Sequence, residues 1–348
     1  MPSSLPALMN GDLSALAARW RLNGHAAHEP GPGMLALQAP GLSSRQLLLS
    51  VGVHGDEVAP IEMLAPVLDA LLRKPERLTM NLLLVVGNPA ALAAGKRFIA
   101  TDLNRLFSRF GHSAGMQEEN DAQAQMEALR ARAIMQASAE FFGEAAAPKW
   151  HLDLHSTIRP SLHARFAIIP TSPHDSTQLP LAAWLGSAGM QALVFNDLPA
   201  KTFSAFTARE CDALSCTIEL GQVGVSGVDQ SASLMPTQQA LQHLLCTMPS
   251  AKAEAGAHPT PAGNFSGLPI DRVEPVRYRV AREVIKQESG FQLNPALTAR
   301  NFAAVPAGGW IARQGEAIVR PGNLTEYIVF PNPDVALGKR AALTVVAC

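Results

Sequence analysis

Charge and cysteine are both scarce in this sequence of 348 residues. Only 16% of the residues are charged, and the formal net charge is −1. No basic stripe stands out, so we predict neither a general affinity for polyanions nor a nucleic-acid partner. The chain has 4 cysteines and none of them forms a CxxC pair. This low cysteine content argues against a disulfide framework and favours a reducing compartment, so we expect a cytoplasmic protein.

Long apolar runs are also missing. No segment approaches the ~20 consecutive apolar residues that a membrane span requires, and the first residues lack the basic start of a secretion signal. We therefore expect no membrane partner. The composition is nevertheless 47% hydrophobic, which is enough to bury a large core. The length suggests two domains, or one large domain with an appendage.

Apolar runs alternate with helical periodicity from residue 47 onward. Residues 47–53 and 82–86 are continuous apolar runs, typical of strands covered on both faces. Between them, residues 57–72 carry apolar side chains at helical spacing. The Ala-rich residues 120–142 predict another helix. Further strands are expected at residues 150–154, 166–169, 192–195 and 216–220. This alternation predicts an α/β layered fold.

The character of the sequence changes near residue 247. Residues 251–267 are rich in Pro, Ala and Gly and are interpreted as a linker. The short β-like stretches that follow lie at residues 276–284, 310–312, 317–319, 327–330 and 343–347. We therefore divide the chain into an α/β domain (1–250), in which the candidate residues for hydrolytic chemistry described below lie, the linker, and a β-rich C-terminal domain (268–348).

The first candidates for chemistry follow the strand that ends near Val53. His54 and Glu57 lie three positions apart around a turn at Gly55, so their side chains can converge on one metal ion. The carboxyl ends of strands are also where open α/β sheets bind ligands. The alternative is a turn histidine followed by an acidic residue that the helix dipole favours.

A second histidine lies far downstream, on the strand expected at 150–154. Asp153 and His155 are two positions apart, so they share one face, and Asp153 could orient the imidazole of a ligand. Asp153 could equally be a buried acid that backbone N–H groups satisfy. His151 shares this face and competes as a ligand, although it lies farther from the expected mouth of the site. Two imidazoles and one carboxylate form a zinc set with a position left for water, which zinc activates near neutral pH.

Two further motifs complete the set of candidates. Asn104 and Arg105, with Arg97 nearby, suit a carboxylate because arginine donates a bidentate fork; the alternative is a solvated basic loop. Glu219 ends an apolar strand, where partial burial would raise its pKa and suit it to general base and acid chemistry. A structural pairing with an arginine would explain the same position.

Taken together, these segments resemble the zinc carboxypeptidase superfamily, and within it the aspartoacylase and succinylglutamate desuccinylase branch. The segments that carry the likeness are Val53-His54-Gly55-Asp56-Glu57, Gly87-Asn88-Pro89, Gly95-Lys96-Arg97, Asp102-Leu103-Asn104-Arg105-Leu106-Phe107, Asp153-Leu154-His155-Ser156-Thr157 and Ile218-Glu219-Leu220-Gly221. The late stretch 328–338 and residues 203–207 resemble the bacterial desuccinylases more than aspartoacylase.

The resemblance implies a zinc-carboxypeptidase-like mixed sheet flanked by helices, with a smaller C-terminal β-rich domain. It also implies one zinc ion per subunit, bound by His54, Glu57 and His155. By the same likeness, Glu219 is the general base and acid, and Arg97 polarises the scissile carbonyl. The residues that grip the amino-acid carboxylate are then Asn104 and Arg105.

The implied reaction is hydrolysis of the amide bond of N-succinyl-L-glutamate to succinate and L-glutamate, in arginine catabolism by the succinyltransferase route. One alternative is another N-acyl amino acid deacylase, such as an aspartoacylase-like enzyme. Aspartoacylases use a late tyrosine, and neither Tyr278 nor Tyr327 falls at a convincing match. A catalytically silent ligand-binding homologue is the alternative that is not an enzyme. The sequence does not decide which residue binds the acyl tail, and Arg159, Arg165 and Arg209 are the candidates. It does not fix the oligomeric state either, and a homo-oligomer is one possibility.

Overall fold

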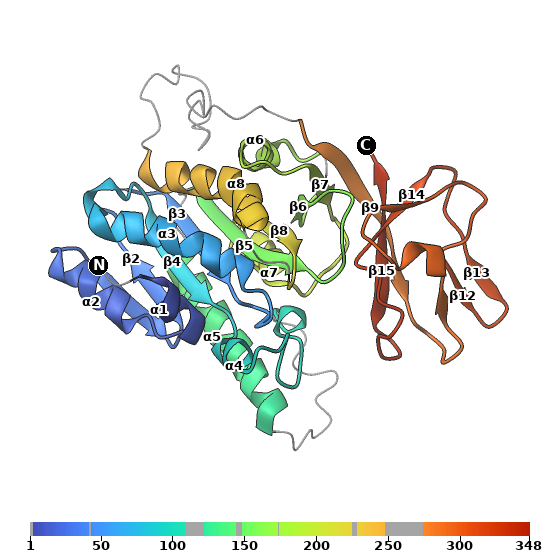
Figure 1. Ribbon diagram of the computed structural model, residues 1–348, viewed down its shortest axis with the longest axis horizontal. Coiled ribbons are helices and arrows are strands. Elements are labelled where there is room, and N and C mark those ends of the chain that lie inside the picture. The colour runs from blue at the N-terminus through green and yellow to red at the C-terminus, as the bar shows by residue number, and fades with distance from the viewer. Residues whose placement is uncertain are drawn as a thin grey trace.

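The computed structural model describes residues 3–41, 43–108, 122–143, 148–172, 174–224, 228–247 and 274–348. The linker expected at 251–267 lies outside these residues. Within them, the dominant feature is one large mixed sheet that runs through the whole molecule (Figure 1). Its strand order is β1-β2-β4-β3-β5-β8-β6-β7-β9-β15-β14-β11.

The strands of this sheet follow the apolar runs of the sequence. Their bounds are β1 (Ala27–Gly31), β2 (Met34–Leu37), β3 (Gln46–Val51), β4 (Asn81–Val86), β5 (Lys149–Thr157), β6 (Arg165–Ile169), β7 (Ala192–Phe195), β8 (Leu214–Gln222), β9 (Val276–Ile285), β11 (Ala303–Val305), β14 (Glu326–Val329) and β15 (Arg340–Ala347). A small separate sheet contains β10 (Gln292–Leu293), β12 (Ala312–Gln314) and β13 (Ala317–Val319).

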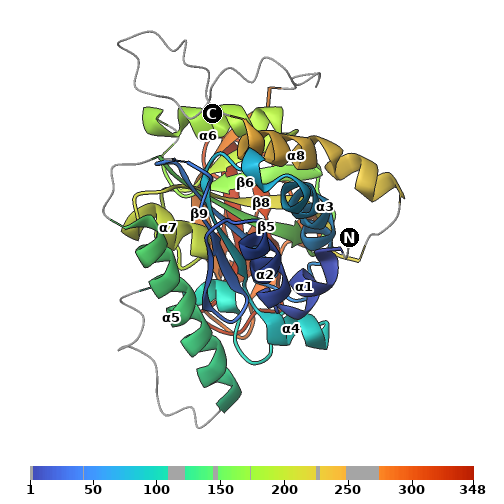
Figure 2. The same ribbon diagram turned by 90° about the vertical axis from the view of Figure 1, so that its left-hand side faces the viewer.

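Helices cover both faces of the large sheet in its N-terminal part. They are α1 (Leu5–Asn10), α2 (Ser14–Leu22), α3 (Ala59–Arg73), α4 (Pro89–Ala94), α5 (Ala122–Phe142), α6 (Leu179–Ser187), α7 (Phe203–Glu210) and α8 (Val228–Cys246). Short 3-10 turns are η1 (Pro75–Arg77), η2 (Leu103–Arg105), η3 (Ser176–Gln178) and η4 (Pro295–Leu297). Figure 2 shows α5 and α7 on one side of the sheet, and α2, α3 and α8 on the other.

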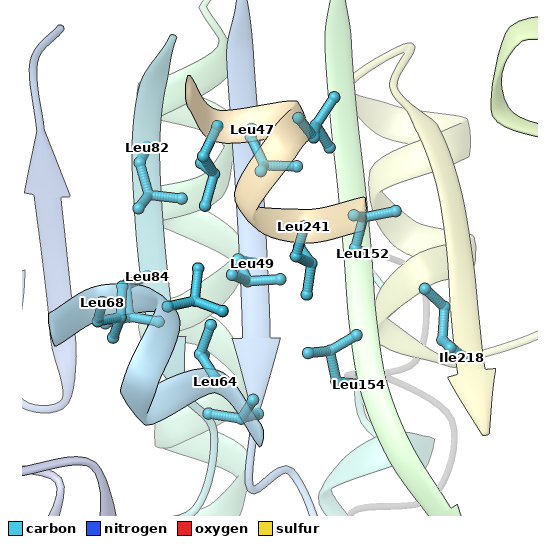
Figure 3. Packing of buried hydrophobic residues seen from close by; sticks show 14 of the residues in the cluster. Leu47, Leu49, Leu64, Leu68, Leu82, Leu84, Leu152, Leu154, Ile218 and Leu241 are labelled. Atoms are coloured by element: carbon cyan, nitrogen blue, oxygen red, sulfur yellow. The ribbon is translucent and has the colours of Figure 1, made fainter. Parts of the chain in front are cut away.

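The core divides into layers because the strands alternate their side chains between the two faces. Leu47, Leu49, Leu82, Leu84 and Leu152 point to the face that α3 and α8 cover, and all are buried (Figure 3). The opposite face packs against residues of α5 and α7. These two layers hold the sheet rigid between them, and its strand ends can therefore position functional groups.

The central strands β4, β3, β5 and β8 run parallel, so their carboxyl ends meet at the same edge of the sheet. Beyond them β6 pairs antiparallel with β8, which makes the sheet mixed. Strand β9 pairs parallel with β7 and antiparallel with β15, so the sheet continues into the C-terminal β-rich part. The predicted fold, a mixed sheet flanked by helices with a smaller β-rich C-terminal part, is confirmed.

Several details differ from the sequence prediction, which did not specify α6, α7, α8, β10 or β11. The helix expected from residue 57 begins at Ala59, so Glu57 lies in the preceding turn. The strand expected at 310–312 forms at Ala312–Gln314 instead. Residues 1–45, for which the sequence predicted no elements, contain α1, α2, β1 and β2. In the described part of the chain, none of the helices combines the length and apolar character needed to cross a bilayer.

Candidate metal centre

The turn after β3 brings His54 and Glu57 to the carboxyl edge of the sheet. Its path depends on glycine, because Gly52 has φ of +62° and a Cβ at Gly55 would lie 2.1 Å from the carbonyl carbon of Ala91. The turn therefore passes directly against the backbone of α4, where only glycine fits. His155 reaches the same edge from the end of the neighbouring strand β5.

These three side chains converge in one buried cluster. The Nδ1 atom of His54 lies 2.8 Å from Oε1 of Glu57, and Nδ1 of His155 lies 2.8 Å from Oε2 of the same carboxylate. One ligand atom from each residue can be chosen so that all lie within 4.8 Å of one another. The residues are 2–3% exposed, so a bound ion would be largely shielded from water. The arrangement can hold a divalent metal ion of the zinc type.

Each imidazole contacts a second carboxylate through the ring nitrogen that does not face Glu57. The Nε2 atom of His54 lies 3.0 Å from Oδ1 of Asp102, and Nε2 of His155 lies 3.0 Å from Oδ2 of Asp153. Each Nε2–H can donate to its carboxylate, which leaves each Nδ1 lone pair for a metal ion. Asp153 thus has the geometry expected of an outer partner. Asp102 plays the same part for His54, and we did not identify it as such from the sequence.

The charges around the imidazoles also favour a cation. Burial opposes ionisation of Glu57, but the charges and hydrogen bonds of His54 and His155 hold its pKa well below the usual range. Burial likewise opposes ionisation of Asp102, whose pKa the hydrogen bond and charge of His54 nevertheless keep low. With Asp153 also ionised, three carboxylates and the guanidinium of Arg97 surround the two imidazoles, and a bound cation would replace the protons that hold the imidazoles charged. The residues present therefore fit a divalent cation.

His151 lies deeper in β5 and outside this cluster. Its Nε2 lies 2.9 Å from Oγ of Ser50 and its Nδ1 lies 2.7 Å from Oγ1 of Thr207. Both ring nitrogens are therefore engaged by hydroxyl groups of the core. The structure places His155, and not its competitor His151, beside Glu57.

Glu219 lies on β8 directly opposite His155 in the register of the two strands. It is 5% exposed, and its Oε2 atom is buried without a hydrogen-bond partner. Burial, together with the negative charge of Glu57, raises the pKa of Glu219 to about 7, although the charges of His155, Arg97 and His54 oppose the shift. A buried carboxyl with an unpaired oxygen and a pKa near neutrality has the properties of a general base.

Arg97 also reaches the centre. Its Nη1 donates to Oε1 of Glu57 over 2.9 Å, and its side chain remains 28% exposed. The guanidinium therefore lies between the buried cluster and solvent. This is a position from which a substrate carbonyl at the cluster could be reached.

Asn104 and Arg105 lie on η2, the turn that begins after Asp102. Asn104 is buried, and its Oδ1 accepts a hydrogen bond from the backbone N–H of Phe203 over 2.9 Å. Its oxygen thus fixes the start of α7, which leaves the amide nitrogen as the donor toward a ligand. Arg105 is exposed and donates to the carbonyl of Asn104 over 2.9 Å.

Sequence reasoning missed one cation, Arg340 at the start of β15. Its Nη1 donates to Oε1 of Glu283 over 3.1 Å. Burial lowers the pKa of Arg340, and the positive charge of Arg105 lowers it further, while Glu283 and Asp102 act in the opposite direction. Arg340 is therefore close enough to Arg105 and Asp102 to interact with them electrostatically. The sequence around Arg340 contains no motif that links it to the centre, and Arg340 lies far along the chain from the residues that it approaches.

The arginines considered for the acyl tail have other partners. Arg159 donates to the carbonyl of Pro331 over 2.8 Å. Arg165 donates to the carbonyls of Gly189 and Ser233, and Arg209 to Glu210 and to the carbonyl of Ala200. These contacts tie the guanidinium groups to the backbone or to a neighbouring side chain, and they add no support for a role in binding the acyl tail.

The raised pKa of Glu219 leads to a prediction for the metal-free protein. Folding raises this pKa from 4.5 to about 7, so the wild type gains stability relative to Glu219→Gln at low pH and loses that gain as pH rises from about 4.5 through about 7. Each unit of pKa shift corresponds to about 1.4 kcal/mol. Urea unfolding of both proteins across this pH range measures the difference. A difference that stays constant with pH would contradict the raised pKa.

Two protein-family descriptions match the chain and divide it between them. The succinylglutamate desuccinylase/aspartoacylase catalytic domain matches residues 43–245. The AstE/AspA barrel-sandwich hybrid domain matches residues 273–348. The first match contains every residue of the cluster described above, and the second contains Glu283 and Arg340.

Individual proteins are similar over nearly the whole length. A succinylglutamate desuccinylase of Serratia proteamaculans is 35% identical, over 99% of this chain and 95% of that protein. One from Burkholderia pseudomallei is 34% identical, over 97% of this chain and 88% of that protein. Among solved structures, the succinylglutamate desuccinylase of Chromobacterium violaceum has a TM-score of 0.71 at 30% identity, covering 100% of this chain and 98% of that one. That of Vibrio cholerae has a TM-score of 0.79 at 26% identity, covering 100% and 95%.

Proposed function

Because the chain belongs to the succinylglutamate desuccinylase/aspartoacylase family, which deacylates N-acyl amino acids, we propose that it hydrolyses N-succinyl-L-glutamate to succinate and L-glutamate with one zinc ion per subunit. The ligands would be His54, Glu57 and His155. The observation that carries the proposal is the unpaired, buried carboxyl oxygen of Glu219 beside this metal-binding cluster. We place the reaction in the cytoplasm, as the last step of arginine catabolism through succinylated intermediates.

When bound, a zinc ion in this ligand set would supply a Lewis acid that polarises the amide carbonyl and lowers the pKa of water toward ~7. Glu219 would take the proton of the attacking water at its free Oε2 atom. It would then return that proton to the departing amine of glutamate, as a group with a pKa near neutrality can do. Arg97 would donate to the oxygen on which negative charge develops.

The substrate carries carboxylates at both of its ends, so its pocket needs several cationic donors. Arg105 and the amide nitrogen of Asn104 would bind the amino-acid carboxylate. Arg340 adds a further positive charge within electrostatic reach of Arg105. Glu283 pairs with Arg340 and Asp102 also lies within its electrostatic reach, so these two carboxylates offset the charges of Arg340 and Arg105 until an anionic substrate is bound.

A comparison of substrates tests the proposed specificity. The ratio kcat/KM should be highest for N-succinyl-L-glutamate among N-succinyl-L-glutamate, N-acetyl-L-glutamate and N-acetyl-L-aspartate. Faster hydrolysis of N-acetyl-L-aspartate would instead favour an aspartoacylase-like enzyme. Absence of hydrolysis for all three by a zinc-loaded protein would favour a ligand-binding homologue.

Arg105→Ala should weaken substrate binding more than turnover. A guanidinium that grips a carboxylate contributes a charge-assisted pair, and its loss should raise KM by about tenfold or more at a similar kcat. Steady-state kinetics on N-succinyl-L-glutamate measures both constants. Arg73→Ala, which removes an exposed arginine on α3, is the matched control. An unchanged KM in Arg105→Ala would exclude the role in carboxylate binding.

A further inference from the structure

A chain of buried polar groups extends from His155 into the core. Asp153, Ser50, His151 and Thr207 are each 0% exposed, and each touches the next. They come from β5, β3 and α7, so the chain crosses from the sheet to the helix that packs on it. The apolar side chains of the same layer include Phe203 and Phe206 of α7. Buried polar groups are costly unless their hydrogen bonds are satisfied, so the direction of every bond in this chain matters.

The direction follows from counting hydrogens, starting at Asp153. Its Oδ1 accepts the hydroxyl hydrogen of Ser50 over 2.6 Å. Ser50 then has no second hydrogen for His151, whose Nε2 lies 2.9 Å from Oγ, so Nε2 must carry the proton and donate it. Burial lowers the pKa of His151 to about 4, so the ring is neutral and its Nδ1 is an acceptor.

Thr207 supplies the donor for that acceptor. Its Oγ1 lies 2.7 Å from Nδ1 of His151, closer than it lies to the carbonyl of Ser204 at 3.1 Å. If the hydroxyl hydrogen went to the helix carbonyl, two lone pairs would face each other at the shorter distance. The hydroxyl of Ser215 lies 2.9 Å from Oγ1 and 3.1 Å from the carbonyl of Ala213, and it can donate to either without changing the direction of the bond from Thr207 to His151. One arrangement of hydrogens therefore satisfies the hydrogen bonds that link Asp153, Ser50, His151 and Thr207.

We propose that Thr207, His151 and Ser50 are positioning residues of the metal centre. Through these bonds they hold the carboxylate of Asp153 so that its Oδ2 accepts from Nε2 of His155 and Nδ1 of His155 faces the ion. The inference rests on the proposed metal-binding role of His155. The ion that these positioning residues help to bind is a divalent cation of the zinc type. A change at Thr207 would reach His155 through three intervening side chains, those of His151, Ser50 and Asp153.

Thr207→Val tests the proposal because valine keeps the shape of threonine and removes the hydroxyl. Without its donor, Nδ1 of His151 is left unpaired, the ring is free to adopt the other tautomer, and Ser50 is drawn away from Asp153. We expect the zinc dissociation constant, measured by competition with a chromophoric chelator, to rise about tenfold, in the range typical of losing an outer-shell partner. Thr207→Ser, which restores the hydroxyl, should bind zinc nearly as tightly as the wild type.

A control variant separates positioning from stability. Thr237 on α8 is also 0% exposed, and its Oγ1 donates over 2.8 Å to the carbonyl of Ala188, a residue of the hydrophobic layer that α3 and α8 cover. Thr237→Val should lower the melting temperature of the metal-free protein without changing the zinc dissociation constant. If Thr207→Val behaves like Thr237→Val, the chain is only structural and the proposal is overturned. If the wild type itself binds no zinc, the proposed function fails together with this inference.

A second measurement uses the wild type and does not depend on how a variant folds. Long-range ¹H–¹⁵N spectra of ¹⁵N-histidine-labelled, metal-free protein report the tautomer of each neutral imidazole. His151 should carry its proton on Nε2. A proton on Nδ1 would reverse the direction of the bonds and overturn the proposal.

Discussion

Glu219→Gln should lower kcat for N-succinyl-L-glutamate by about 10²–10⁴-fold, which is the range of contributions measured for general acid–base catalysis. Glutamine has nearly the same shape as glutamate but cannot accept the proton of the attacking water. The buried Oε2 atom, unpaired and opposite His155, is the atom that the variant changes. The loss should appear in kcat, because Glu219 is not one of the proposed zinc ligands.

The measurement combines steady-state kinetics with elemental analysis of the same samples. Zinc content should stay near that of the wild type, so that the lost turnover cannot be attributed to a lost metal. Glu62→Gln, which changes an exposed carboxylate in the first turn of α3, should be as active as the wild type. Turnover near the wild-type value in Glu219→Gln would assign the proton transfer to another group.

His155→Ala should leave the protein with almost no zinc. The substitution removes one of the three side chains that converge at the centre, and it leaves Asp153 and Glu57 without the imidazole that both contact. A structural or catalytic zinc site that loses one protein ligand commonly loses most of its affinity. Hydrolysis of N-succinyl-L-glutamate should fall to background for the same reason.

Zinc per chain, determined by elemental analysis after dialysis, is the quantity to compare. His163→Ala is the matched control, since His163 is a partly buried histidine whose Nε2 lies 3.0 Å from the hydroxyl of Tyr278 rather than at the cluster. That variant should keep its zinc. Full zinc occupancy in His155→Ala would show that the ligand is a different residue.

Much of the fold could be predicted because the apolar runs that form β3 and β4 are continuous and bounded by glycine and proline. The residues of the centre were also predictable in kind, since His54 follows an apolar strand and His155 and Glu219 lie near the carboxyl ends of two others. Parallel strands bring such ends to one edge, and the register of β5 and β8 places His155 opposite Glu219. The meeting of these side chains follows from sheet topology.

The partners of these residues could not be predicted in the same way. Three of these partners come from distant parts of the sequence: Asp102 from a loop, Thr207 from a helix and Arg340 from the C-terminal part. Each is linked to the centre or to its supporting groups by a hydrogen bond or an electrostatic interaction between residues far apart in the sequence. The competition between His151 and His155 was open for the same reason. Periodicity places both on one face of β5, and only the depth of each in the sheet separates them.

The start of α3 shows how a small difference in a boundary changes the chemistry. Residues 57–72 have helical spacing, but the helix begins at Ala59. Glu57 therefore lies in the turn, where one carboxylate oxygen contacts His54 and the other contacts His155. The approach of Gly55 to α4, which no local pattern reveals, sets this path.

The most direct test of the account is hydrolysis of N-succinyl-L-glutamate by the purified chain before metal removal, after removal with a chelator, and after addition of zinc. Release of succinate should be abolished by the chelator and restored by zinc in the wild type, while Glu219→Gln regains its zinc without regaining activity. Undiminished hydrolysis by protein shown to contain no metal would contradict the central claim that His54, Glu57 and His155 hold the ion on which catalysis depends.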